Sequence, residues 1–134
     1  MTLVDSNVLL DVITRDLNWL DWSIEALDRR AAVGPLYITD VVYAELAVKN
    51  DSEASLDESI QILRVARSPI PKSALFLAGK TFGRYRKAGG IRISNIPDFF
   101  IGAHAQIAGL PILTRDVRRY RTYFPDVELI APDV

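Results

Sequence analysis

The sequence predicts an α/β fold with a central, mostly parallel sheet of about four to five strands flanked by helices. Short apolar segments typical of strands lie at residues 3–4, 36–38, 111–114 and 128–130. Longer stretches with helical character separate them, an alternation that favours parallel strands joined by helical crossovers. The chain has 134 residues, 49% hydrophobic and 25% charged. We therefore expect one globular domain over residues 1–134.

The first half of the chain divides at clear breakpoints. The strand Leu3-Val4 ends at an acidic residue. Asn18 is expected to cap a helix that runs to about Ala32, because asparagine is a favoured N-cap residue. Gly34-Pro35 then breaks this helix, and residues 36–38 form the second strand.

The next two helices are predicted from their caps. Thr39 or Asp40 is expected to cap a helix that carries Glu45. Ser55-x-x-Glu58 has the pattern of a capping box, which predicts a helix running to about Ala66.

The second half begins with an amphipathic helix over residues 72–87, which ends before Gly89-Gly90. Asp98 starts a further helix that ends at Gly109. The last two strands follow this helix, with a short basic helical segment between them.

The charges are segregated along the chain although the net charge is only −1. Residues 1–58 hold twelve acidic and four basic residues, residues 59–97 hold eight basic and no acidic residues, and residues 98–134 hold five acidic and four basic residues. The basic middle segment indicates a polyanionic partner, although exposed helices also carry lysine and arginine without one.

Several classes of protein are excluded by composition. The chain has no cysteine, which rules out disulfides and thiolate metal sites, and its single histidine rules out a histidine-rich zinc site. No segment approaches the roughly 20 consecutive apolar residues of a membrane-spanning helix. The N-terminus does not resemble a secretory signal. We therefore expect a cytoplasmic protein without a membrane partner.

Four acidic residues lie among apolar neighbours: Asp5, Glu45, Asp98 and Asp116. Asp5 ends the first strand and Asp116 follows the third, while the other two lie early in predicted helices. In a parallel sheet these positions meet at the carboxyl edge, where ligands bind. Because an unpaired buried carboxylate costs on the order of several kcal/mol, a hard cation such as Mg²⁺ or Mn²⁺ is the expected partner.

Each acidic residue also has a simpler structural explanation. Asp5-Ser6-Asn7 is typical of a strand-to-helix turn, and Asp98 and Asp116 are placed to cap helices. Glu45 favours function more strongly, because its helix face carries mainly valine. Thr114 lies on the same side of its strand end as Asp116 and is suited to orienting a metal ligand.

The ordered combination of these stretches resembles the PIN-domain ribonucleases, and most closely the VapC toxins of prokaryotic toxin–antitoxin pairs. The matching stretches are Val4-Asp5-Ser6-Asn7-Val8-Leu9-Leu10-Asp11, Glu45, Pro97-Asp98-Phe99-Phe100-Ile101-Gly102-Ala103-His104-Ala105 and Leu113-Thr114-Arg115-Asp116. The resemblance implies a PIN-like three-layer fold. It also implies Asp5, Glu45, Asp98 and Asp116 as the catalytic and metal-binding acids, supported by Ser6, Asn7 and Thr114.

The same resemblance implies an endoribonuclease that uses Mg²⁺ or Mn²⁺ and leaves a 5′-phosphate and a 3′-hydroxyl. It further implies a small cognate antitoxin and a homodimer. The residue that accepts the proton of the attacking water stays open among Glu45, Asp98 and Asp116. Candidate RNA-binding cations are Lys80, Arg84, Lys87, Arg92, Arg115, Arg118 and Arg119.

Two tyrosines and the single histidine are further candidates for site residues. Tyr85 and Tyr120 have the side chains needed to stack on unpaired bases, although packing is the commoner role. His104 lies six residues after Asp98, about 240° around the helix at roughly 100° per residue. We therefore expect it to face away from the acidic site.

Three other functions have partial support. A phosphoacceptor receiver domain also places acids at strand ends, but it needs a second acid beside Asp5 and a lysine after a late strand. A haloacid-dehalogenase-like phosphatase needs an acid two residues after Asp5, where this chain has Asn7. A catalytically silent protein-binding module is the third alternative.

Overall fold

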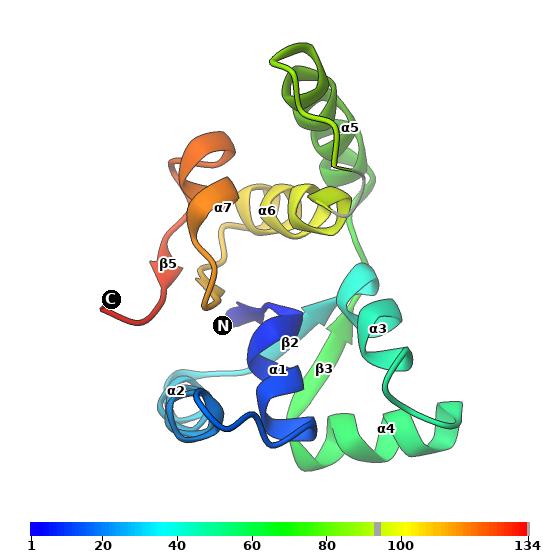
Figure 1. The fold of residues 1–134 in the computed structure, drawn as a ribbon, viewed down its shortest axis with the longest axis vertical. Coiled ribbons are helices and arrows are strands. Elements are labelled where there is room, and N and C mark those ends of the chain that lie inside the picture. The colour runs from blue at the N-terminus through cyan, green and yellow to red at the C-terminus, as the bar shows by residue number, and fades with distance from the viewer. Residues whose placement is uncertain (93–94, 134) are drawn as a thin grey trace.

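A computed structural model describes residues 1–92 and 95–133. Its centre is one five-stranded sheet in the order β3-β2-β1-β4-β5, and each pair of neighbouring strands is parallel (Figure 1). The strands are β1 (Thr2–Val4), β2 (Leu36–Thr39), β3 (Val65–Ser68), β4 (Ile112–Leu113) and β5 (Leu129–Ile130). The predicted α/β class with a parallel sheet is confirmed.

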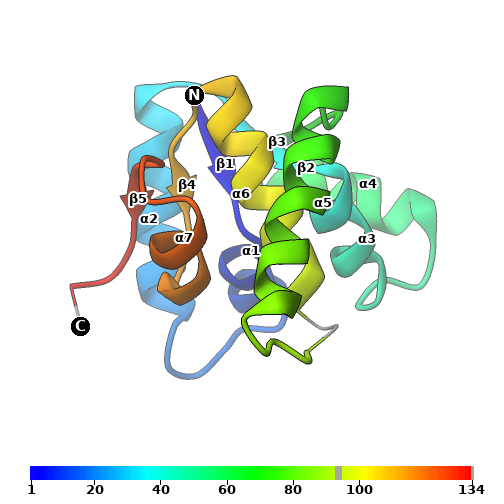
Figure 2. The ribbon, with the colours of Figure 1, turned by 90° about the horizontal axis from the view of Figure 1, so that it is seen from above.

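Seven helices surround the sheet in the described part of the chain. They are α1 (Ser6–Ile13), α2 (Leu20–Val33), α3 (Asp40–Ala47), α4 (Glu53–Ile62), α5 (Lys72–Lys87), α6 (Ile96–Ala108) and α7 (Arg118–Tyr123). Helices α6 and α7 lie over one face of the sheet, and α1 and α2 lie over the other (Figures 1 and 2). Helix α5 packs along α6. None of these helices has the length and apolar composition that crossing a membrane requires.

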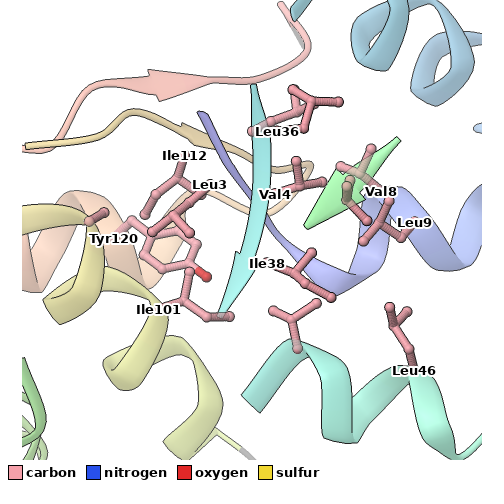
Figure 3. Packing of buried hydrophobic residues seen from close by; sticks show 14 of the residues in the cluster. Leu3, Val4, Val8, Leu9, Leu36, Ile38, Leu46, Ile101, Ile112 and Tyr120 are labelled. Carbon is pink, nitrogen blue, oxygen red and sulfur yellow. The ribbon is translucent and has the colours of Figure 1, made fainter. Parts of the chain in front are cut away.

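The central strand β1 buries side chains on both of its faces. Figure 3 shows Leu3 turned toward Ile101 and Tyr120, on the side of α6 and α7, whereas Val4 turns toward Val8 on α1. Leu3, Val4 and Val8 are all fully buried. A parallel strand covered on both faces reads as a continuous apolar run, and this explains the apolar start of the chain.

The strand order creates a switch point between β1 and β4. From β1 the chain builds β2 and β3 on one side, and β4 and β5 on the other. Leu3 pairs with Ile112 and Val4 with Leu113, so the two strands end side by side. Ligands of open α/β sheets bind outside the carboxyl ends of strands at such a point. Asp5 and Thr114, the residues that follow these strands, therefore lie where a binding site is expected.

Three elements differ from the sequence-based predictions. Helix α1 follows β1 directly and was not among the predicted elements, because it has only eight residues and no linker precedes it. Strand β3 (Val65–Ser68) begins with Val65 and Ala66, which we predicted as the end of a helix. Helix α4 ends at Ile62, Arg64 has a positive φ of 61°, and the chain then pairs with β2. Only Val65 of this edge strand is fully buried, so its apolar pattern is weak.

Two predicted helix caps are wrong. The Asp16 carboxylate accepts from the backbone N–H groups of Asn18 and Trp19, both at 2.9 Å, and α2 begins only at Leu20. Ser52 rather than Ser55 caps α4, because its hydroxyl oxygen accepts from the Ser55 N–H at 3.0 Å. In both cases an equally suitable side chain lies two or three residues earlier in the sequence.

Gly102→Ala is expected to destabilise the fold by about 1–3 kcal/mol, the usual cost of overpacking a core. A Cβ at Gly102 would lie 2.3 Å from Cδ2 of Phe124, which is buried. Urea unfolding measures the change. Gly79→Ala on α5 is the control, because its Cβ would meet nothing within 4 Å. Equal stability of the two variants would contradict the packing described here.

Candidate active site

Asp5 is held at the start of α1 by the turn that follows β1. It is the N-cap residue of this helix, and its Oδ1 accepts the Ser6 backbone N–H at 2.8 Å. Only 4% of the residue is exposed. The sequence places an acid here because Asp is a favoured N-cap residue, and the short loop fixes its carboxylate at the switch point.

The second oxygen of Asp5 accepts three side-chain donors. These are the Thr114 hydroxyl at 2.8 Å, the Tyr120 hydroxyl at 2.9 Å and Nδ2 of Asn7 at 3.4 Å. Asn7 also accepts the Arg115 backbone N–H through Oδ1 at 3.2 Å. The donors come from three separate segments, so the orientation of the carboxylate is fixed. Oδ2 thus accepts three donors, whereas Oδ1 accepts only the Ser6 N–H among the described residues.

The four predicted acids influence one another through their charges. Burial, followed by the nearby charge of Asp98, raises the pKa of Asp5 to about 6. Burial also raises the pKa of Glu45 to about 7, opposed by the Ser6 hydroxyl and reinforced by the charges of Asp5 and Asp98. Such mutual perturbation in the predicted set indicates a functional site rather than scattered surface acids.

Glu45 carries a buried side-chain oxygen that is unsatisfied among the described residues. Its Oε1 is buried and has no hydrogen-bond partner among the described residues. Helix α3, which positions it, contacts both α1 and α6. A buried carboxylate oxygen without a donor is costly, so this atom lacks a partner that a bound cation would supply.

Asp98 and Asp116 are neutralised mainly by arginines. Arg119 Nε donates to Asp98 Oδ2 at 2.6 Å. Arg118 donates to both oxygens of Asp116 at 3.1 Å. Burial raises the pKa of Asp98, and Arg119 opposes this change. The pKa of Asp116 is lowered, chiefly by its hydrogen bond with Arg118.

The residues present suit a hard divalent cation. Their donor atoms are carboxylate and hydroxyl oxygens, which Mg²⁺ and Mn²⁺ prefer. The orphaned oxygen of Glu45 independently favours a cation at this place. However, within residues 1–92 and 95–133 no three acidic or histidine side chains have the geometry to hold a metal ion. The acids are thus electrostatically coupled at one sheet edge without forming a closed set of ligands.

Arg115 is engaged away from the acidic site. Its Nε and Nη2 donate to the two oxygens of Asp11 at 2.6 and 2.8 Å, and its guanidinium lies 4.9 Å from the ring centroid of Trp19. Ser23 donates to the same carboxylate at 2.7 Å. This network ties α1 and α2 to the turn after β4, so Arg115 would have to leave Asp11 to bind a phosphate.

The other predicted RNA-binding cations fall into two groups. Arg118 and Arg119 are paired with site acids, as described above. The remaining side chains lie on or just after α5 and are exposed to solvent: Lys80, Arg84, Lys87 and Arg92. These four are the exposed members of the predicted set that form no ion pair with the described residues.

The structure separates the histidine and tyrosine candidates. His104 is buried, and its Nδ1 lies 3.0 Å from the Thr39 hydroxyl, so it is a packed histidine with a hydrogen-bond partner. Burial lowers its pKa. Tyr120 is only 1% exposed, so the idea that it stacks on a base is wrong. Tyr85 packs against Phe99, and its hydroxyl accepts from Asn95 Nδ2 at 2.8 Å.

The role of Tyr120 in holding Asp5 was not apparent from the sequence. Tyr120→Phe is expected to lower the Mn²⁺ affinity of the acidic site about tenfold, because loss of a hydrogen-bond partner behind a metal ligand costs roughly 10–100-fold. Tyr123→Phe on the same helix is the matched control and is expected to keep the wild-type affinity. A Tyr120→Phe chain with the same Mn²⁺ affinity as this control would show that the hydroxyl has no such role.

Several solved structures have a fold similar to that of this chain. VapBC2 from Rickettsia felis, bound to a promoter DNA fragment, is 18% identical with a TM-score of 0.73 over 98% of each chain. VapBC-1 from nontypeable Haemophilus influenzae is 18% identical with a TM-score of 0.71, over 97% of this chain and 96% of that one. FitAcB from Neisseria gonorrhoeae is 20% identical with a TM-score of 0.62, over the same shares.

The family model of the PIN domain matches residues 2–125. The chain therefore belongs to the PIN domain family, whose members are nucleases. A search of curated protein sequences found no significant match. Membership of this family excludes the receiver-domain and phosphatase alternatives. It also agrees with the acids found at the sheet edge.

Proposed function

We propose that this protein is an endoribonuclease that uses Mg²⁺ or Mn²⁺ and acts as the toxin of a toxin–antitoxin pair. The orphaned buried oxygen of Glu45, beside Asp5 and Asp98, is the observation that carries the proposal. Such a group is costly in a structural role and useful in a cation site. PIN-domain membership supplies the nuclease class.

Asp5, Glu45, Asp98 and Asp116 would hold the cation. When bound, the ion would polarise the scissile phosphate and lower the pKa of a water molecule. Thr114 and Tyr120 orient Asp5 through its Oδ2, which leaves Oδ1 to face the cation. Which of the other three acids accepts the proton of the attacking water stays open. Cleavage that leaves a 5′-phosphate and a 3′-hydroxyl is the expected outcome.

An acidic site repels the phosphates of RNA, so RNA binding requires basic residues nearby. Helix α5 carries Lys80, Arg84 and Lys87, and its C-terminal end lies by the start of α6, which carries Asp98 (Figure 2). RNA phosphates bound along this surface would direct the RNA toward the acids. Contacts of this kind are sensitive to salt and insensitive to sequence.

The toxin assignment is supported by the structures of similar fold. One of them is a toxin–antitoxin complex from Klebsiella pneumoniae, 20% identical with a TM-score of 0.64 over 90% of each chain. We propose that a small cognate antitoxin binds this chain, that the chain forms a homodimer, and that it acts in the cytoplasm. Light scattering of the purified chain tests the dimer.

Cleavage of total cellular RNA by the purified chain tests the proposed activity. The wild type is incubated with Mg²⁺, Mn²⁺ or chelator, and the variant Asp98→Asn is tested beside it under the same conditions. Asp126→Asn is the control, because Asp126 is exposed in the turn before β5 and lies beside Pro111 at the start of β4, not at the carboxyl end of the strand where the site acids lie. We expect discrete fragments that need metal and disappear with Asp98→Asn alone. Fragments that persist in chelator, or uncut RNA in every lane, would contradict the proposal.

A further inference from the structure

Arg119 lies between two of the site acids in the first turn of α7. Its Nε donates to Asp98 Oδ2 at 2.6 Å, and its Nη2 lies 3.9 Å from Asp116 Oδ2. The side chain is 25% exposed. The neighbouring Arg118, paired with Asp116, is 80% exposed. Arg119 is thus a shielded cation that joins acids from two separate elements, α6 and the turn after β4.

We propose that Arg119 is the internal counter-cation of the acidic site: it holds Asp98 and Asp116 in the metal-free protein, and its ion pair with Asp98 must open when a divalent cation binds. The inference rests on the proposed function, because it concerns the affinity of the same site. It assigns to Arg119 a role in setting metal affinity, in place of the RNA contact predicted from the sequence.

The contacts around Arg119 explain why it occupies this position. Asp98 is half-buried and repelled by Asp116, so it requires positive charge nearby. Tyr120, the next residue, is fixed by its hydrogen bond to buried Asp5. This anchor holds the start of α7 against the acids and brings the guanidinium within reach of Asp98. A surface arginine on a flexible segment would lack such a constraint.

The ion pair and a bound cation would compete for the same carboxylate. Oδ2 of Asp98 already accepts a short, charge-assisted hydrogen bond, and such bonds are among the stronger ones in proteins. An interaction that exists only in the metal-free state lowers metal affinity by its own strength. Removing the guanidinium should therefore tighten divalent-cation binding about tenfold, the scale of one hydrogen bond to a charged group.

Mn²⁺ titration followed by electron paramagnetic resonance tests this inference on the full chain. Arg119→Gln is compared with the wild type and with Arg121→Gln, an exposed arginine of the same helix for which the described residues show no ion pair. Arg119→Met is a second neutral variant of similar length. We expect both Arg119 variants to bind Mn²⁺ about tenfold more tightly, and Arg121→Gln to match the wild type.

Thermal unfolding provides a second readout that does not depend on activity. In chelator, Arg119→Gln should unfold at a lower temperature than the wild type, because Asp98 and Asp116 lose their counter-charge. Saturating Mn²⁺ should close this gap. Mn²⁺ affinities of both Arg119 variants within twofold of the wild type would overturn the inference alone. A wild-type chain that binds no Mn²⁺ would overturn the proposed function as well.

Discussion

Asp5→Asn is expected to lower RNA cleavage by at least about a hundredfold while the chain stays folded. Asp5 is the most firmly held of the four acids, with four hydrogen-bond donors around its two oxygens. Loss of a partner behind a metal ligand already costs roughly 10–100-fold, so loss of the ligand charge should cost more. Initial rates on RNA, measured with saturating Mg²⁺, give the ratio.

Asp5→Asn is expected to reduce cleavage without unfolding the chain. The amide oxygen can still accept from Thr114 and Tyr120, and the change removes a buried negative charge, but the amide nitrogen cannot accept the Ser6 N–H. Because these effects oppose each other, we expect an unfolding temperature in chelator close to that of the wild type. Asp21→Asn, an exposed acid in the first turn of α2, is the control for a surface change. Asp5→Asn with near wild-type cleavage would remove Asp5 from the active site.

Glu45→Gln is expected to stabilise the metal-free protein at pH 8 and to change how its stability depends on pH. The pKa of Glu45 in the folded chain is raised to about 7 from 4.5. The folded state therefore holds the proton more tightly than the unfolded state. The resulting stability is fully present below about pH 4.5 and is lost as the pH rises through 7. Asp5, with a pKa of about 6, acts in the same direction.

Urea unfolding in chelator at pH 5 and pH 8 measures this effect. The wild type should lose stability between these values, and Glu45→Gln should be about 1–2 kcal/mol more stable than the wild type at pH 8, after allowance for partial exposure. Glu58→Gln, an exposed glutamate on α4, serves as the matched control. A Glu45→Gln chain less stable than the wild type at pH 8 would contradict the unsatisfied state of Oε1.

The effect of saturating Mg²⁺ on stability tests whether Glu45 takes part in cation binding. Binding to the folded chain alone raises its stability in proportion to the logarithm of ligand concentration. The wild type at pH 8 should therefore gain stability with Mg²⁺, whereas Glu45→Gln should gain less. An equal gain in both would show that Glu45 does not take part in binding.

The sequence was sufficient to predict the parts of the fold that depend on local pattern. The amphipathic stretch over residues 72–87 forms α5 with the predicted bounds. Asp5 lies at the end of β1 as predicted, because an apolar run followed by an N-cap residue is a local signal. The helix expected from Asp98 begins two residues earlier, at Ile96, since proline is tolerated in a first turn.

The remaining features depend on contacts between distant segments. Strand β3 is specified by its pairing with β2 and not by its own exposed residues. The hydrogen bond from Tyr120 to Asp5 joins residues 115 positions apart. Arg119 and Arg115, which we predicted to bind RNA, are likewise paired with Asp98 and Asp11. A single sequence contains no local pattern that reveals such pairings.

Calorimetric titration of Mn²⁺ into the wild type and four single variants tests the central claim most directly, because it requires no knowledge of the RNA substrate. The variants are Asp5→Asn, Glu45→Gln, Asp98→Asn and Asp116→Asn. We predict saturable binding to the wild type that Mg²⁺ displaces, and weaker binding in each variant. Unchanged Mn²⁺ binding in all four variants would contradict the assignment of these acids as the metal site.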